Sequence, residues 1–237
     1  MITVIAIDAL EYELAEQFDL SHLKQTYYGK TDISEFSEPR TIVLWSSFMT
    51  GKNMESEILA GGEKEMWNIR IDHSDSFFSR FKEPCIIDLP GYNYDLEQHT
   101  RERGLLSAYF DADEEEKEKI KKKYNEHAFE HHRRIRSEFM KALKGGHDFI
   151  CCYFSIADVI GHLNFGNRAL MRVIYRELSE IASGVDGELI ILSDHGMKAI
   201  GGFGDHSEYG FWSSGSKDLG TPKITDFARI ITSMAMD

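Results

Sequence analysis

The sequence predicts an α/β fold, with a mostly parallel sheet flanked by helices on both faces. Three apolar runs, Ile2–Ile7, Phe149–Phe154 and Leu189–Leu192, have the length and composition of buried parallel strands. Helical patterns lie between and after these runs, and this alternation is typical of α/β proteins. The 237 residues suit a single domain over 1–237. Its more polar middle region, residues 54–147, leaves room for only a small cap.

The first third of the chain predicts two helices after the first strand. One covers about Glu11–Phe18, and the other begins near Thr41 and ends at Gly51, since glycine is the preferred residue just past a helix. In the middle region, the pattern of Cys85–Leu89 predicts a strand that ends before Pro90-Gly91. Asp111 and Glu114 have the spacing of a capping box for a long helix to about Leu143, whose charged face we expect to be solvated.

The last third returns to strand and helix. An amphipathic helix ends at Gly184, and a second helix follows close to the C-terminus. The apolar faces of these two helices comprise Leu170, Val173, Ile174, Leu178 and Ile181 in the first, and Phe227, Ile230, Ile231 and Met234 in the second.

Composition excludes several classes of function. The net charge of −13 argues against a nucleic-acid polymer as partner, because no basic stripe is present to neutralise phosphates. No apolar run approaches the length of a membrane span. Cys85, Cys151 and Cys152 all fall in apolar runs without CxxC spacing, which favours reduced, buried thiols. With no signal-peptide pattern before the first strand, we expect a cytoplasmic protein that does not bind membranes.

Aspartates and histidines recur just past the apolar runs. Ligands in open α/β sheets bind beyond the carboxyl ends of the strands, so these side chains are expected at one edge of the sheet. Mixed Asp and His ligation suits zinc, manganese or iron rather than calcium. Six ligands are enough for two metal ions with open positions. The six candidates are Asp8, Asp158, His162, Asp194, His195 and His206.

The order of these motifs resembles the alkaline phosphatase superfamily, and most closely its branch of type I phosphodiesterases and nucleotide pyrophosphatases. Asp8 is followed by the segment Pro39–Gly51, then by DVIGH at Asp158–His162, SDHGM at Ser193–Met197, and finally His206. The resemblance implies an alkaline-phosphatase-like core over residues 1–53 and 148–232. It also implies that Thr41 is a covalent nucleophile.

The same resemblance implies the metal assignment. Asp8, Asp194 and His195 would bind one metal, with Thr41 on it, while Asp158, His162 and His206 would bind the second. Zn²⁺ is the expected metal, with Mn²⁺ as an alternative. Many relatives carry Pro-Asn after the nucleophile, where this chain has Ile42-Val43-Leu44. A phosphate contact from Asn is therefore missing, which makes nucleotides less favoured as substrates.

Physical chemistry also supports Thr41 as the nucleophile, independently of the resemblance. The start of a helix offers backbone N–H groups and a positive dipole end, where phosphate charge is stabilised. Metal coordination lowers the pKa of a hydroxyl nucleophile. The simpler interpretation is that Thr41 only caps the helix. Ser46, Ser47 and Thr50 are alternative hydroxyls, and Arg40 is either a phosphate contact or a surface charge.

Other histidines have weaker patterns. His127 and His131 have i,i+4 spacing but lack the Glu that a zinc protease needs directly after the first His. His131 and His132 run into Arg133-Arg134 on a charged helix, so we expect them on the solvated surface.

The predicted function is hydrolysis of a small phosphate ester, preferably a diester, through a phosphothreonine at Thr41. One alternative is a phosphomonoesterase or phosphomutase of the same superfamily. Another is a metal-binding protein of this fold without turnover. The sequence does not determine the oligomeric state.

Overall fold

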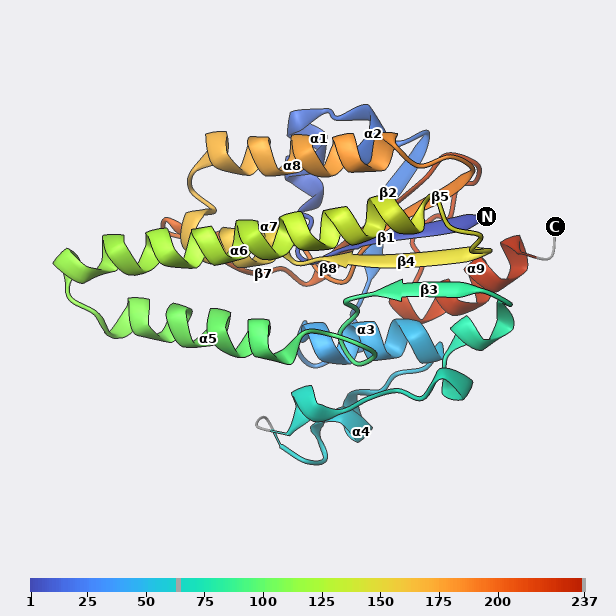
Figure 1. Ribbon diagram of the computed structural model, residues 1–237, viewed down its shortest axis with the longest axis horizontal. Helices are drawn as coiled ribbons and strands as arrows, with labels where there is room; N and C mark the ends of the chain where they lie inside the picture. The colour runs from blue at the N-terminus through green and yellow to red at the C-terminus, as the bar shows by residue number, and fades with distance from the viewer. Residues whose placement is uncertain (63–64, 236–237) are drawn as a thin grey trace.

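The computed structural model describes residues 1–62 and 65–235. Six strands form one sheet in the order β2-β8-β5-β1-β4-β3 (Figure 1). β1 pairs in parallel with both β4 and β5, and β3 in parallel with β4, whereas β8 runs antiparallel to β5 and β2. The strands are β1 Ile2–Ile7, β2 Tyr27–Asp32, β3 Pro84–Ile87, β4 Phe149–Phe154, β5 Glu188–Ser193 and β8 Tyr209–Ser214. The predicted α/β class with a mostly parallel sheet is confirmed.

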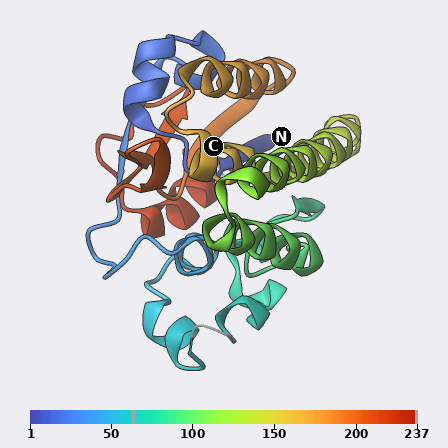
Figure 2. The same cartoon turned by 90° about the vertical axis from the view of Figure 1, so that its left-hand side faces the viewer.

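Helices cover both faces of this sheet (Figure 1). On one face lie α1 (Tyr12–Phe18), α2 (Ser21–Lys24), α6 (Glu114–Ala142), α7 (Ile156–Asn164) and α8 (Arg168–Ser183). On the other face lie α3 (Thr41–Thr50), α4 (Glu55–Leu59) and α9 (Phe227–Met234), together with the short helices η1 (Met66–Asn68), η3 (Phe77–Arg80) and η4 (Ile224–Asp226). The short helix η2 spans His73–Asp75, and α5 (Leu96–Asp111) runs alongside α6 (Figure 2). β6 (Met197–Ile200) and β7 (Phe203–His206) form a separate hairpin.

Alternating side chains divide the core between the two faces. In β1, Ile5 and Ile7 pack with the α6–α8 side, while Val4 and Ala6 pack with the α3–α9 side. Since both faces are buried, the strands are apolar throughout rather than alternating with polar residues. The sequence pattern of continuous apolar runs therefore has a direct structural cause.

Several element boundaries differ from the prediction. The strand after η3 is Pro84–Ile87 rather than Cys85–Leu89. The capping residue of α6 is Asp113, whose Oδ1 accepts from the backbone N–H groups of Glu115 and Glu116. Asp111 instead ends α5. Val173, expected on the buried face of α8, is 45% exposed. Strands β2 and β8 were not predicted, because their sequences, YYGKTD and YGFWSS, mix polar and apolar residues and lack a continuous apolar run.

The surface prediction for His131 and His132 is wrong. Both lie on the inner face of α6, with exposed fractions of 5% and 4%. His131 Nε2 lies 2.8 Å from Asp88 Oδ2, just past β3, and His132 Nε2 lies 3.2 Å from Glu177 Oε1 on α8. A carboxylate partner offsets the cost of burying each imidazole.

Within the described ranges, no helix has the length and apolar character needed to cross a membrane.

Candidate metal centre

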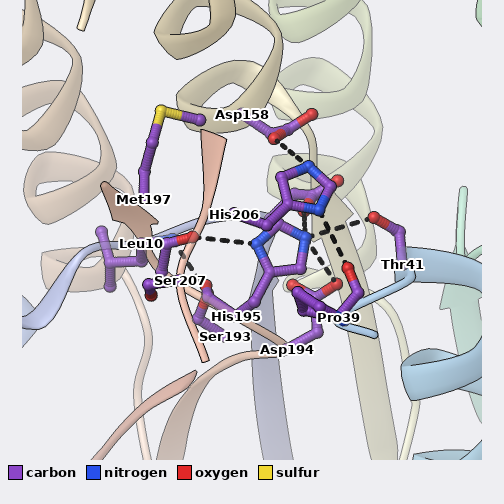
Figure 3. A network of polar contacts seen from close by, with 12 residues as sticks. Leu10, Pro39, Thr41, Asp158, Ser193, Asp194, His195, Met197, His206 and Ser207 are labelled. Carbon is purple, nitrogen blue, oxygen red and sulfur yellow. Dashed lines mark hydrogen bonds and ion pairs between the residues drawn. The ribbon is translucent and has the colours of Figure 1, made fainter. Parts of the chain in front are cut away.

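The sheet topology brings the predicted Asp and His side chains to one place. β1 lies between β4 and β5, so the carboxyl ends of these three strands are adjacent. Asp8 follows β1, and Asp194 and His195 follow β5 directly. Asp158 and His162 lie one turn apart on α7, which begins two residues after β4. His206, at the end of β7, completes the group (Figure 3).

His195 lies at the centre of the first cluster. Its Nε2 lies 3.2 Å from Asp8 Oδ1 and 3.5 Å from Asp194 Oδ2. All three residues are buried. One ligand atom from each falls within 4.8 Å of the others, which is close enough for one ion to reach all three.

Asp158 joins the remaining histidines. Its Oδ2 lies 3.2 Å from His162 Nε2, and its Oδ1 lies 3.4 Å from His206 Nε2. Asp158, His206 and His195 form a second group with ligand atoms within 4.8 Å. The His195 and His206 rings stack with centroids 3.8 Å apart. His195 thus belongs to both groups, a sharing that the sequence motifs did not indicate.

Backbone carbonyls orient all three imidazoles. The Nδ1 atoms of His162, His195 and His206 lie 3.2, 3.0 and 2.9 Å from the carbonyl oxygens of Gly204, Gly196 and Pro39. A ring that donates its Nδ1–H to a carbonyl presents Nε2 as the free ligand atom. Each Nε2 also lies 3.2–3.4 Å from a carboxylate oxygen, so that imidazole and carboxylate donor atoms lie close together.

Burial shifts the pKa values of all three residues in the first cluster toward their neutral forms. Burial, followed by the charge of Asp158, raises the pKa of Asp8 to about 8. Burial and the charge of Asp8 raise the pKa of Asp194 well above its usual range. Burial and the neighbouring His206 lower the pKa of His195 to about 3, so its ring is neutral. The first cluster is therefore two buried carboxyl groups around a neutral imidazole.

Asp158 has a different environment. Burial works against its charge, but His162 and His206 hold its pKa well below the usual range. Burial likewise opposes the charge on His162, yet Asp158 raises the pKa of that imidazole to about 9. Here the carboxylate is charged and balanced by its own histidines.

Buried acceptor atoms in the first cluster fit a cation. Asp8 Oδ1 and both carboxylate oxygens of Asp194 are buried without a hydrogen-bond partner in the described part of the chain, as is Asp158 Oδ1. Leaving such groups unpaired costs free energy, so a bound cation is the natural partner. Carboxylate and imidazole donors suit Zn²⁺ or Mn²⁺.

Thr41 faces this centre from α3. Its Oγ1 lies 3.3 Å from His195 Nε2 (Figure 3). The residue that caps α3 is Arg40, so Thr41 occupies the first helical position rather than the cap. The alternative hydroxyls lie elsewhere. Ser47 Oγ donates to Val43 O at 2.7 Å, Thr50 Oγ1 donates to Ser46 O at 2.9 Å, and Ser46 Oγ is buried beside Gly91.

Two further residues hold the candidate ligands in place, and the sequence did not single them out. The Tyr153 hydroxyl, on β4, donates a hydrogen bond to Asp8 Oδ2. Glu11 Oε2 accepts the backbone N–H of Met197 at 2.8 Å, and Glu11 Oε1 accepts the Tyr209 hydroxyl at 2.7 Å. Glu11 therefore fixes the segment between His195 and His206. A tyrosine in an apolar strand and a glutamate at a helix start give no distinctive sequence signal.

The DVIGH motif also has a packing role. Gly161 lies so close to the Met197 side chain that a Cβ at this position would overlap it. This contact seats α7 against the β6–β7 hairpin, which carries His206. The glycine between Asp158 and His162 thus permits the two halves of the centre to approach each other.

The centre opens into a cavity of about 1270 Å³. Thr41, Asp8, Asp158, His162 and His206 all line it. Arg40 also lines the cavity, and its guanidinium forms an ion pair with Glu38 at 2.7 Å. Arg40 is therefore a charged residue at the cavity rather than only on the outer surface. The other walls come from three places: residues of the middle region, including η1 and α5, the segment that leads into α3, and the β6–β7 hairpin with the residues just after it.

Comparisons with known proteins bear on the fold. No protein-family profile matches this sequence, and no curated protein matches it. Among solved structures, the chain resembles murine ectonucleotide pyrophosphatase/phosphodiesterase 5, with 13% identity and a TM-score of 0.46. A structure of an inactive variant of that mouse protein in complex with AMP gives 12% identity and the same TM-score. The match covers 84% of this chain but only 58% of the mouse protein in both cases. At these identities the likeness concerns the fold alone.

Proposed function

We propose that this protein is a metal-dependent phosphoric-ester hydrolase that cleaves phosphodiesters through a nucleophilic Thr41. The observation that carries the proposal is the placement of Thr41 Oγ1, 3.3 Å from His195 Nε2 and on the wall of the cavity. Thr41 is the first residue of α3, where the helix presents unpaired N–H groups and its positive dipole end to an anion.

The two clusters divide the metal ligands. Asp8, Asp194 and His195 would hold one ion, with Thr41 beside them. Asp158 and His206 would hold the second together with His162, whose Nε2 lies 3.2 Å from Asp158 Oδ2, and His195 is within reach of this second group too. When bound, two such ions neutralise phosphate charge and activate oxygen nucleophiles for phosphoryl transfer.

Three further points remain predictions from the sequence: that the metal is zinc, that the chain is a single domain, and that the protein is cytoplasmic.

The reaction divides into two displacements at phosphorus. Thr41 Oγ1 loses its proton and forms a bond to phosphorus as the bond from phosphorus to the leaving oxygen breaks, and the leaving alkoxide takes up a proton to become the alcohol. Water then attacks the phosphothreonine, releases the phosphate monoester and returns a proton to Thr41 Oγ1. Backbone N–H groups at the start of α3 face the phosphate oxygens throughout, which favours the charge that develops there.

A substrate comparison tests this proposal. The chain, supplied in turn with Zn²⁺, Mn²⁺ and Mg²⁺, is assayed with bis-p-nitrophenyl phosphate and with p-nitrophenyl phosphate. Preference for the diester supports the proposal. Preference for the monoester would point to a phosphomonoesterase, and tight metal binding without hydrolysis of either ester would point to a binding protein.

A further inference from the structure

One face of α5 forms the wall of the cavity away from α3. Residues at helical spacing along it line the cavity: Leu96, His99, Glu102, Arg103 and Leu106. This helix belongs to the middle region that the sequence assigned only to a small cap. Since the cavity connects this wall with Thr41 and the metal ligands, α5 is placed to contact the organic part of an ester.

Aromatic rings connect the metal centre to this wall. Tyr153, which donates to Asp8, packs edge-on against Tyr94 with centroids 5.7 Å apart. Tyr94 in turn lies 5.9 Å from Trp67 and 5.8 Å from His99, between ring centroids. A ligand that reaches from the metals to α5 therefore passes along these rings.

Glu102 is a buried carboxylate on this wall. The residue is 4% exposed, and its Oε1 accepts from Gln98 Nε2 at 2.8 Å. In the described part of the chain, no Lys, Arg or His lies within ion-pair distance of it. Burial raises the pKa of Glu102, and the charges of Asp158 and Asp88 raise it further, although Gln98 and His131 oppose this. Such an acceptor is stabilised by any additional donor.

Two phenol groups accompany this carboxylate. Tyr94 and Tyr124 line the cavity with exposed fractions of 6% and 1%. Across the described ranges, neither hydroxyl makes a hydrogen bond to another residue. Buried polar groups of this kind are normally satisfied by water or by a ligand. The wall thus presents one strong acceptor and two hydroxyls that can both donate and accept.

We propose that Glu102 selects the leaving group of the ester by accepting a hydrogen bond from it, in the cavity that Tyr94 and Tyr124 also line. The leaving group would be a small alcohol bearing a hydroxyl or an amine. An anionic leaving group is disfavoured, because Glu102 is a buried carboxylate on the cavity wall that pairs with no cation in the described part of the chain. The proposal rests on the proposed function, since it names the substrate class for that reaction.

Arg103 offers the competing interpretation. It is exposed and lines the same cavity, and within the described part of the chain it forms no ion pair. A guanidinium binds carboxylates and phosphates well, so an anionic leaving group would be expected to use it. The test therefore includes an anionic ligand.

Binding of non-hydrolysable ligands tests the proposal without relying on turnover. Methylphosphinates, in which carbon replaces both ester oxygens so that no P–O–C bond remains, are prepared with side arms matching glycerol, ethanolamine, propanol and glycolate. Their dissociation constants are measured by calorimetry on the Zn²⁺-loaded full chain. The variants are Glu102→Leu, the isosteric Glu102→Gln and the control Glu97→Gln. Glu97 lies on the exposed side of α5 and pairs with Arg101 at 3.2 Å.

The glycerol or the ethanolamine ligand, or both, should bind about 10–100-fold more tightly than the propanol ligand, as expected for hydrogen bonds to a charged group. Glu102→Leu should bring this ratio close to one, while Glu97→Gln should preserve it. Glu102→Gln distinguishes the two donors, because it retains an acceptor for a hydroxyl but loses the charge that attracts an ammonium group.

Two results would overturn the proposal: tightest binding of the glycolate ligand, or an unchanged ratio in both Glu102 variants. If Glu102→Leu does not fold, Glu102→Gln still decides the ammonium case and the wild-type ratios decide the hydroxyl case. Failure of the wild-type chain to hydrolyse the corresponding phosphodiesters would count against the proposed function alone, because these binding ratios do not depend on catalysis.

Discussion

The hydroxyl oxygen of Thr41 and the Nε2 atom of His195 lie 3.3 Å apart, although 154 positions separate them in the sequence. Thr41 begins α3 on one face of the sheet, and His195 follows the central strand β5. Because His195 belongs to both metal-type clusters, the hydroxyl is beside the residue that the two clusters share.

Thr41→Ala removes the attacking oxygen but keeps all six metal ligands. Turnover of the diester should fall by several orders of magnitude while metal content is unchanged, as for loss of a covalent nucleophile. Thr41→Ser should retain measurable activity because the hydroxyl survives. Steady-state kinetics with elemental analysis checks both. Thr50→Ala is the matched control, since its hydroxyl bonds to Ser46 O on the same helix. Near-normal turnover in a folded, metal-loaded Thr41→Ala chain would falsify the phosphothreonine mechanism.

The purified protein should contain up to two transition-metal ions per chain. Chelation by EDTA should abolish hydrolysis and leave most of the secondary structure, because the apolar core lies within the sheet and its helices rather than at the ligands. Elemental analysis and circular dichroism measure the two effects. Full activity in EDTA with no detectable metal would end the two-metal account.

Two histidine variants should differ in how many metal ions they affect. His195→Ala should weaken both sites, since its Nε2 is within reach of each cluster. His206→Ala should weaken one site and spare the other, because Asp8, Asp194 and His195 remain. Metal titrations that resolve two binding events would show the difference. Equal loss of both ions in the two variants would mean that the clusters bind as one coupled unit.

Tyr153→Phe tests the residue that orients Asp8. Removing its hydroxyl takes away the hydrogen bond to Asp8 Oδ2 but leaves the packing against Tyr94 and Trp45. Metal affinity or activity should fall about 10–100-fold, as for other groups that hydrogen-bond to a metal ligand. Thermal stability should change little, and a large drop in melting temperature with normal metal affinity would contradict this role. Tyr109→Phe on α5 serves as a control, since the Tyr109 ring packs against Phe110 and Phe203 rather than against Asp8.

Stability of the metal-free chain should depend on pH. The pKa of Asp8 rises from 3.8 to about 8 on folding, mainly because of burial. A raised carboxyl pKa contributes stability below the unfolded value, and that stability is lost as pH rises through the folded value. The melting temperature of the metal-free protein should therefore fall between pH 5 and about 8. Zn²⁺ should reduce this dependence, since it stabilises the ionised carboxylates. Calorimetry with and without metal measures the difference, and a flat profile without metal would argue against buried, unpaired carboxyl groups.

The sequence determined the parts of the fold that depend on continuous local patterns. Apolar runs such as Phe149–Phe154 are buried on both faces, and Gly51 adopts φ 69° to end α3, so both could be read from residue type. The charged helix α6 was harder. Its composition indicated a solvated surface, but His131 and His132 face inward, because charge content does not reveal which side of a long helix packs.

For the candidate site, the sequence determined which residues follow the strands, and thus which side chains reach the carboxyl edge of the sheet. Only the tertiary structure decided how they group. The order of β4, β1 and β5 places His195 between two clusters, and it places Tyr153 against Asp8. No sequence pattern singles out Glu102, because its position on the cavity wall depends on how α5 packs. Distances between residues far apart in the chain arise from strand order and helix packing, and neither is encoded in local spacing.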